Sequence, residues 1–229
     1  MLLNLLRGGD MVSLLINLLV RVFIVLCCLP FHEFAHAWVA DKLGDKTPRL
    51  AGRLTLNPFA HLDLWGTVMI FLVGIGYAKP VEVNVRNMRC GTKQGLALTA
   101  AAGPLSNILL ALIIMLISNT AALLLGNVNP EFAELLVVWL SLAASINVTL
   151  AVFNLLPIPP LDGFNILQIF LPYKAVRFVS QYHVYIRYGL LALLLLGVLS
   201  VPISLLSNAL YSGMSWLASL PFALFGAAA

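Results

Sequence analysis

Residues 30–39 read PFHEFAHAWV, and this stretch decides both the fold and the chemistry of the chain. It places the pattern HExxH, formed by His32, Glu33 and His36, inside an apolar run from Met11 to Val39. In a helix, His32 and His36 share one face, where both imidazoles can bind one metal ion. Ionisable groups at bilayer depth are costly and usually face a cavity, a partner or a metal. The pattern therefore indicates a zinc site of the hydrolase type inside a membrane, with Glu33 as the general base.

The composition is that of an integral membrane protein. Of 229 residues, 61% are hydrophobic and 10% are charged, and the mean hydropathy is +0.99. Soluble domains carry roughly 25% charged residues. The net charge of +4 comes from Lys and Arg side chains near the ends of apolar spans, which is information about topology and not a nucleic-acid footprint.

We expect an all-α polytopic membrane protein, a helical bundle of about four to six membrane segments in a single domain over residues 1–229. The catalytic core would occupy about 11–171, and C-terminal membrane segments about 188–229. Apolar runs long enough for a helix of roughly 20 residues predict spans at about 11–39, 94–118, 134–157 and 188–207. A further apolar segment, 209–226, either spans or lies re-entrant, because Gly213 and Pro221 interrupt it. Pro30 is expected to kink the first helix.

Two shorter segments follow the first span. The apolar stretch 64–78 is short for a membrane helix, which suggests a re-entrant element. Within 79–86, Val81, Val83 and Val85 alternate with polar residues, as in a half-buried strand. We therefore expect a short β-strand or hairpin near 79–86 whose exposed edge pairs with an extended substrate.

The distribution of basic residues orients these pieces. The loop 119–133 has no Lys or Arg, whereas 79–93 and 172–187 are basic, so the first lies outside and the other two lie inside. The first span then runs from outside to inside, and its motif lies toward the cytoplasmic leaflet.

A catalytic zinc ion of this kind needs a third protein ligand. Asp162 follows the span that returns to the inner face, and three prolines before it break the helix at a depth where such backbone lines a cavity or is buried in protein. We therefore expect Asp162 to be the third ligand. A simpler interpretation is that Asp162 only caps the helix that follows it.

At this point the chain resembles the site-two protease family of intramembrane zinc metalloproteases. The resemblance rests on His32-Glu33-x-x-His36 and on Asn154-x-x-Pro157-x-x-Pro160-Leu161-Asp162-Gly163. Two further segments are similar to motifs of that family, Ala102-Gly103-Pro104-Leu105-Ser106-Asn107 and Ala78-Lys79-Pro80-Val81. The match runs in order over roughly 30–171. The chain resembles a compact bacterial-type member, because it has no room for an inserted PDZ domain or a nucleotide-sensing domain.

The resemblance implies roles for particular residues. His32, His36 and Asp162 would bind one zinc ion per chain, and Glu33 would be the general base. Asn154 and Asn107 would lie near the substrate, with Asn154 a candidate to polarise the scissile carbonyl. Gly103 is a candidate for the same substrate-binding or oxyanion role, although close helix packing explains it equally well.

The resemblance also implies a setting and partners. The chain would be a multi-pass protein of the cell membrane, with the active site toward the cytoplasmic leaflet. Its partners would be the lipid bilayer and transmembrane proteins or signal peptides as substrates, and no nucleic acid.

Three alternatives stay open from the sequence. A membrane zinc protease with a glutamate as third ligand would need Glu82, Glu131 or Glu134. A zinc carrier or sensor would bind the metal without hydrolysis and would have no need of Glu33. An inactive scaffold ranks last, because every expected catalytic position is filled.

Overall fold

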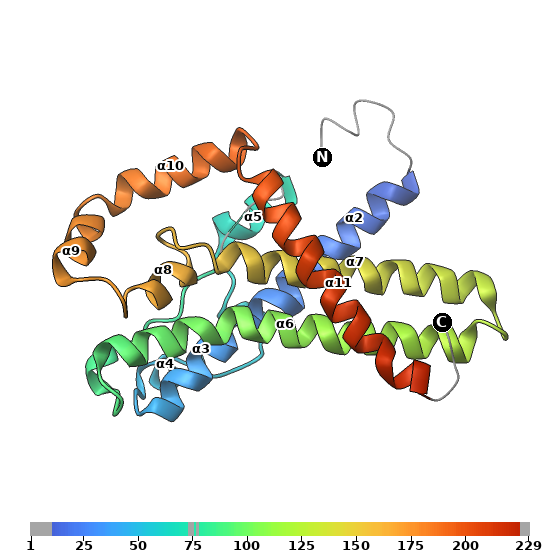
Figure 1. Ribbon diagram of the computed structural model, residues 1–229, viewed down its shortest axis with the longest axis horizontal. Coiled ribbons are helices and arrows are strands. Elements are labelled where there is room, and N and C mark those ends of the chain that lie inside the picture. Colours follow the sequence, from blue (N-terminus) through green and yellow to red (C-terminus); the bar gives the residue numbers. More distant parts are fainter. Residues whose placement is uncertain (1–10, 73–75, 77, 225–229) are drawn as a thin grey trace.

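The computed structural model describes residues 11–72, 76 and 78–224, and every regular element within them is helical (Figure 1). Three helices are long and apolar enough to cross a membrane, or up to four if a bent pair near the C-terminus counts as one span. The all-helical membrane fold is therefore confirmed, at the lower end of the expected number of segments.

The first span is one continuous helical rod with a widened turn before the motif. It consists of α2 (Met11–Phe23), the π-helix η1 (Ile24–Cys28) and α3 (Leu29–Leu43). In η1 the amide of Leu29 donates to the carbonyl of Ile24, five residues back. Pro30 follows directly and has no N–H to donate to the preceding turn. A π turn thus lies directly before Pro30, at the position where we expected a kink.

The apolar segment 64–78 begins and ends at the same place in the structure. Its helix, α5 (Leu64–Leu72), has nine residues and is only about 14 Å long at 1.5 Å per residue, roughly half the thickness of the hydrocarbon core. The amide of Lys79 donates to the carbonyl of His61 over 2.8 Å, so the two ends of the segment meet. Arg21 of α2 donates to the carbonyl of Ile70 near the end of α5. Residues 73–75 and 77 lie outside the described residues, and the part that is described agrees with a re-entrant element.

The strand predicted near 79–86 is wrong, since these residues are irregular up to the 3-10 turn η3 (Val85–Asn87). The alternation of the sequence is real, because Val81, Val83 and Val85 are half-buried and the residues between them are exposed. The segment nevertheless has no partner strand among the described residues. The amides of Val81 and Asn84 donate to side-chain carboxylates, so they are not free for the edge pairing that we expected.

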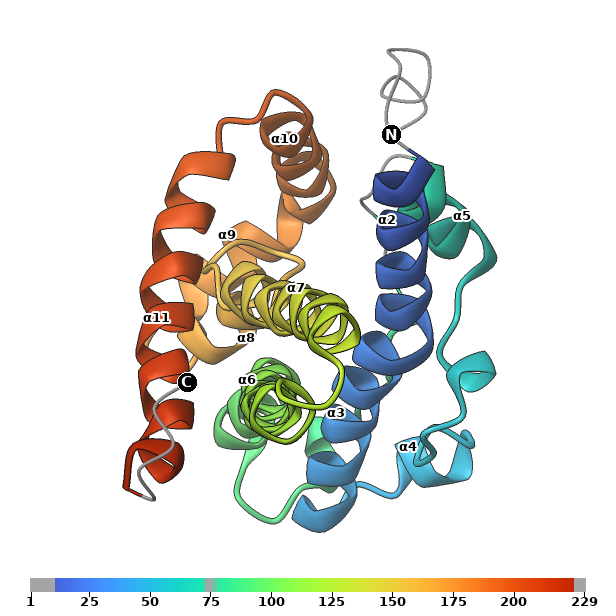
Figure 2. The same cartoon turned by 90° about the vertical axis from the view of Figure 1, so that its right-hand side faces the viewer.

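Helices α6 (Thr92–Leu125) and α7 (Pro130–Asn154) form the central hairpin. Figure 2 views the pair nearly end-on, with α2 and α3 on one side and α11 on the other. Small buried residues such as Ala111, Ala143 and Ala144 line the contact between the two helices. Large apolar residues such as Leu105 and Leu109 point outward and are more than half exposed. This inside-out pattern is typical of a membrane bundle, in which small residues allow close packing and lipid covers the rest.

The C-terminal third contains α8 (Asp162–Leu167), α9 (Tyr173–Gln181), α10 (His183–Leu195) and α11 (Ser200–Leu224). The span predicted over 188–207 is not one straight helix, because the chain bends by 79° between α10 and α11, and the bent pair qualifies as a membrane span only when the two helices are taken together. Gly197 causes the break, since its φ of 72° and the bonds from its amide to Leu194 and from Val198 to Leu193 end α10 in a Schellman motif. Helix α11 continues through Gly213 and Pro221, which we had expected to interrupt it.

Asp45 joins the end of the first span to the segment that follows α5. Its fully buried carboxylate accepts hydrogen bonds from the amide and hydroxyl of Thr47, the amide of Asn84 and the side chain of Asn87. Burial raises the pKa of Asp45, but these hydrogen bonds outweigh burial and hold its pKa below the ordinary value. The charged carboxylate therefore fixes segment 79–87 beside α3.

We expect Asp45→Asn to lower the free energy of unfolding by about 1–3 kcal/mol at pH 7. The NH2 group of the asparagine would face N–H groups that now donate to the Asp45 carboxylate, and these donors would lose their acceptor. The folded chain binds the Asp45 proton more weakly than the unfolded chain. The contribution of the Asp45 carboxylate to the free energy of unfolding is therefore complete above the ordinary aspartate pKa of about 4. It is lost as the pH falls through the lower pKa that Asp45 has in the folded state. Thermal unfolding in detergent should show a lower unfolding temperature for the variant than for wild type at pH 7, and a smaller difference between the two temperatures at pH 3. The exposed Glu82→Gln is the matched control and should show no difference from wild type at either pH.

Candidate metal centre

Helix α3 presents His32 and His36 on one face, as the four-residue spacing requires. Their Nε2 atoms lie 3.0 Å apart, and the rings meet edge to face with centroids 4.6 Å apart. Both side chains are buried, at 6% and 8% exposure. The two nitrogens therefore converge on one point inside the protein.

Asp162 brings a carboxylate to the same point from a different helix. Its Oδ2 lies 3.2 Å from Nε2 of His32 and 3.4 Å from Nε2 of His36. Asp162 is the first residue of α8, and the N-cap position belongs to Leu161. The carboxylate of Asp162 faces the two histidines.

The hydrogen-bond partner of His36 indicates which of its ring nitrogens carries a proton. Nδ1 of His36 lies 2.7 Å from the carbonyl oxygen of Thr99, which can only accept a hydrogen bond. Nδ1 therefore carries a proton, and Nε2, which faces His32 and Asp162, is the nitrogen that would bind a metal ion.

This donor set fits a zinc ion. Two imidazole nitrogens and one carboxylate oxygen, all within 4.8 Å of one another, form the one group of three such side chains found in the described part of the chain. The negative carboxylate of Asp162 and the lone pair on Nε2 of a neutral His36 would both attract a cation placed between them. Two histidines and one carboxylate are a ligand set used by catalytic zinc sites, which keep a further position open.

Helix α6 forms the wall behind the histidines. Gly103 lies so close that a Cβ atom there would touch Nε2 of His36 and would lie 2.5 Å from Cε1 of His32. Asn107, one turn further along, places Nδ2 3.3 Å from Nδ1 of His32. The structure thus brings both residues to the site, Gly103 through the absence of a side chain and Asn107 through contact with a candidate ligand.

Asn154 is the predicted site residue that the structure does not bring into the cluster. It is the last residue of α7, and its Nδ2 donates to the carbonyl of Leu150 over 2.9 Å within the same helix. Its role near a substrate stays a prediction.

Glu33 stands beside the ligands and has one hydrogen-bond partner that the sequence could not reveal. Its Oε2 accepts from the amide of Val81 over 3.2 Å. The carbonyl of Thr99 was missed for the same reason, because a backbone group leaves no trace in the residue type. The stripe of Thr99, Gly103 and Asn107 at four-residue spacing on α6 was the available signal.

The alternative ligands lie elsewhere. Glu131 and Glu134 are in the first turns of α7, and the 20 residues from Glu134 to Asn154 correspond to roughly 30 Å of helix. Glu82 is exposed on the segment after α5. None of these three glutamates joins the cluster of His32, His36 and Asp162.

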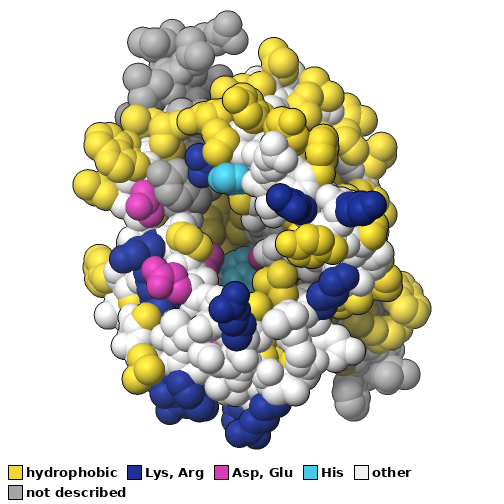
Figure 3. Space-filling view, turned by 90° about the vertical axis from the view of Figure 1, so that its left-hand side faces the viewer, with side chains coloured by type: hydrophobic (Ala, Val, Ile, Leu, Met, Phe, Trp, Pro, Cys, Tyr) yellow, Lys and Arg dark blue, Asp and Glu magenta, His cyan; other side chains and the backbone are white. Residues whose placement is uncertain are grey.

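The site is reachable from one face of the molecule. Figure 3 shows this face hollowed, with histidine and acidic side chains visible at the floor and Lys and Arg side chains around the rim. The carboxylate of Asp162 is 16% exposed, so the centre is buried but not sealed.

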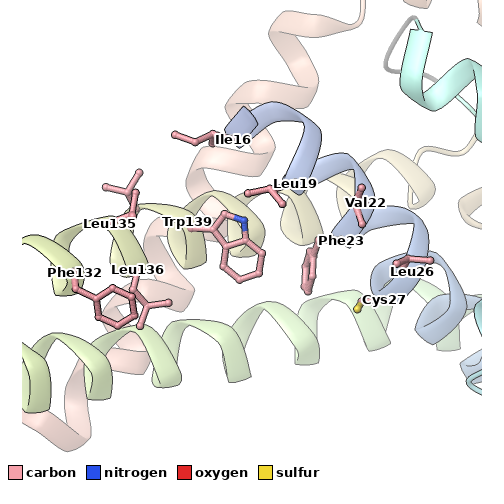
Figure 4. A pocket seen from close by; sticks show the side chains of 11 residues that line it. Ile16, Leu19, Val22, Phe23, Leu26, Cys27, Phe132, Leu135, Leu136 and Trp139 are labelled. Atoms are coloured by element: carbon pink, nitrogen blue, oxygen red, sulfur yellow. The ribbon is translucent and has the colours of Figure 1, made fainter. Parts of the chain in front are cut away.

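A separate cavity of about 470 Å³ lies between α2, η1 and the first half of α7 (Figure 4). Its walls are apolar side chains, among them Leu19, Phe23 and Trp139. It shares no residue with the His–Asp cluster, and no histidine or carboxylate side chain lines it.

Comparison with known proteins finds one family model and several relatives that match this chain. The sequence matches the model of Peptidase family M50 over residues 20–134 and 125–197. A protein of Bacillus subtilis named "Putative zinc metalloprotease YwhC" is 39% identical over 155 residues, which cover 66% of this chain and 68% of that protein.

The mycobacterial relatives are longer. "Putative zinc metalloprotease Rip2" of Mycolicibacterium smegmatis is 34% identical over 149 residues, covering 62% of this chain and 54% of that protein. Its namesake in Mycobacterium tuberculosis is 35% identical over 151 residues, with 64% and 54% covered. This chain therefore spans about half the length of these relatives. No solved structure matches the chain significantly.

Proposed function

Because this chain belongs to Peptidase family M50, the site-two protease family, we propose that it is an intramembrane zinc metalloprotease. It would hydrolyse peptide bonds within or near transmembrane segments of membrane proteins. The observation that carries the proposal is the meeting of His32, His36 and Asp162, because two of these ligands lie on a helix long and apolar enough to cross a membrane.

The three side chains would hold one zinc ion through Nε2 of each histidine and a carboxylate oxygen of Asp162. Zinc in such a site polarises the scissile carbonyl and lowers the pKa of water toward roughly 7. Glu33 would take a proton from the attacking water at its carboxylate and pass it to the leaving amine. The amide of Val81 would hold that carboxylate in place through its bond to Oε2.

Hydrolysis needs water and an extended substrate, and both would reach the site from the hollowed face in Figure 3. The segments 79–93 and 172–187 are basic and the loop 119–133 contains no Lys or Arg, which favours a cytoplasmic position for this face. The chain would then act in the cell membrane from the cytoplasmic leaflet. Its substrates would be transmembrane proteins or signal peptides whose helix unwinds before cleavage.

A non-proteolytic zinc carrier or sensor is the second candidate. The His–Asp cluster alone would serve such a protein equally well. Glu33 favours the protease, because a carrier needs no carboxylate beside its ligands.

The first test is the zinc content of the full chain purified in detergent, because it needs no known substrate. We expect about one zinc ion per wild-type chain and a loss of affinity of at least about 100-fold in Asp162→Ala, more than an outer hydrogen bond contributes. Glu82→Ala serves as control and also tests the glutamate alternative. Equal zinc in wild type and Asp162→Ala would overturn the assignment of the third ligand.

A further inference from the structure

Asn107 is a buried amide whose hydrogen bonding is incomplete. Its side chain is 1% exposed, and its Oδ1 has no hydrogen-bond partner among the described residues. Its Nδ2 lies 3.3 Å from Nδ1 of His32. A buried amide oxygen without a partner is costly, so this arrangement needs a physical reason.

The reason lies in the state of His32 when a metal is bound. His32 directs Nε2 toward the same point as His36 and Asp162, at 3.0 Å and 3.2 Å. A neutral histidine that gives the lone pair of Nε2 to a metal carries its proton on Nδ1. In that state Nδ1 is a donor and needs an acceptor, as Nδ1 of His36 has in the carbonyl of Thr99.

We propose that Asn107 is a positioning residue that holds His32 by accepting a hydrogen bond from its Nδ1. The oxygen and the NH2 group of an amide are nearly equal in size, so a half-turn exchanges them without moving the side chain. This half-turn brings Oδ1 to Nδ1 of His32, where an acceptor then faces the donor in place of two opposed N–H groups, and it moves Nδ2 to the position that Oδ1 now occupies. The inference rests on the proposed metal site and goes beyond it, because it assigns Asn107 to a ligand and not to the substrate.

Helix α6 would then orient both histidines, one through the backbone carbonyl of Thr99 and one through the side chain of Asn107. The two acceptors are eight residues apart, on either side of Gly103, which lets the helix approach the rings. Acceptors of this kind fix the ring orientation and raise the basicity of the ligand nitrogen.

The test is the zinc affinity of the full chain in detergent, measured by competition with a chelator of known affinity. We expect Asn107→Leu to weaken zinc binding roughly 10- to 100-fold, the usual effect of losing such a partner. Asn107→Asp keeps an acceptor and should restore the affinity to within a few-fold of wild type. Asn147→Leu is the matched control, since Asn147 is an equally buried amide with an unpaired Oδ1 that contacts Cys28 and not a histidine.

Each outcome decides the matter. Wild-type affinity in Asn107→Leu, an equal loss in Asn147→Leu, or an Asn107→Asp variant no better than Asn107→Leu would each overturn the inference. If wild type binds no zinc, the inference fails together with the proposed function. If wild type binds zinc and the Asn107 variants behave as expected but no substrate is cleaved, the inference stands and only the protease assignment fails.

Discussion

Replacing Glu33 by Gln is expected to leave zinc binding unchanged and to reduce peptide-bond cleavage by at least about 100-fold, the low end of what a general base contributes. The two side chains have the same shape, but an amide cannot take a proton from water. The amide oxygen can still accept the hydrogen bond from Val81, so the local structure should persist. The change therefore separates proton transfer from metal binding.

The measurement uses the full chain in lipid vesicles with a labelled transmembrane substrate, beside a zinc determination on the same preparation. Glu82→Gln, an exposed carboxylate on the neighbouring segment, should cleave like wild type. Cleavage at the wild-type rate by Glu33→Gln would remove the general base and leave the carrier as the better function. Loss of zinc from Glu33→Gln would instead make Glu33 a ligand.

The metal centre was largely predictable from the sequence because its parts obey local rules. The spacing of His32 and His36 on a helix sets their common face, and the charge pattern places Asp162 at the same end of the bundle. The structure agrees with that placement, although Asp162 lies about 130 residues further along the chain.

The errors arose where local patterns depend on a partner. The alternation of Val81, Val83 and Val85 predicts their burial correctly. A β-strand also needs a neighbouring strand to accept hydrogen bonds from its amides. Here the side-chain carboxylates of Glu33 and Asp45 accept two of these hydrogen bonds instead. The apolar run 188–207 contains Gly197, whose left-handed backbone conformation divides one expected span into two helices. Composition alone does not show such a break.

Packing around the histidines leads to the last prediction, that Gly103→Ala damages the metal site. The added methyl group would lie against both rings, touching Nε2 of His36 and standing 2.5 Å from Cε1 of His32. The His36 ring cannot turn away without breaking its bond to Thr99. Overpacking of this kind costs about 1–3 kcal/mol, which corresponds to roughly a 5- to 150-fold loss of zinc affinity if the ligands bear the strain.

Gly213→Ala is the matched control, because Gly213 lies within a helix with open space where its Cβ would stand. Alanine is the better helix former by about 1 kcal/mol, so this variant should bind zinc like wild type and unfold at the same or a slightly higher temperature. Chelator competition and thermal unfolding on both variants measure the two effects separately. Wild-type zinc affinity in Gly103→Ala would mean that α6 can retreat from the rings, and the close approach of α6 would then be dispensable for metal binding.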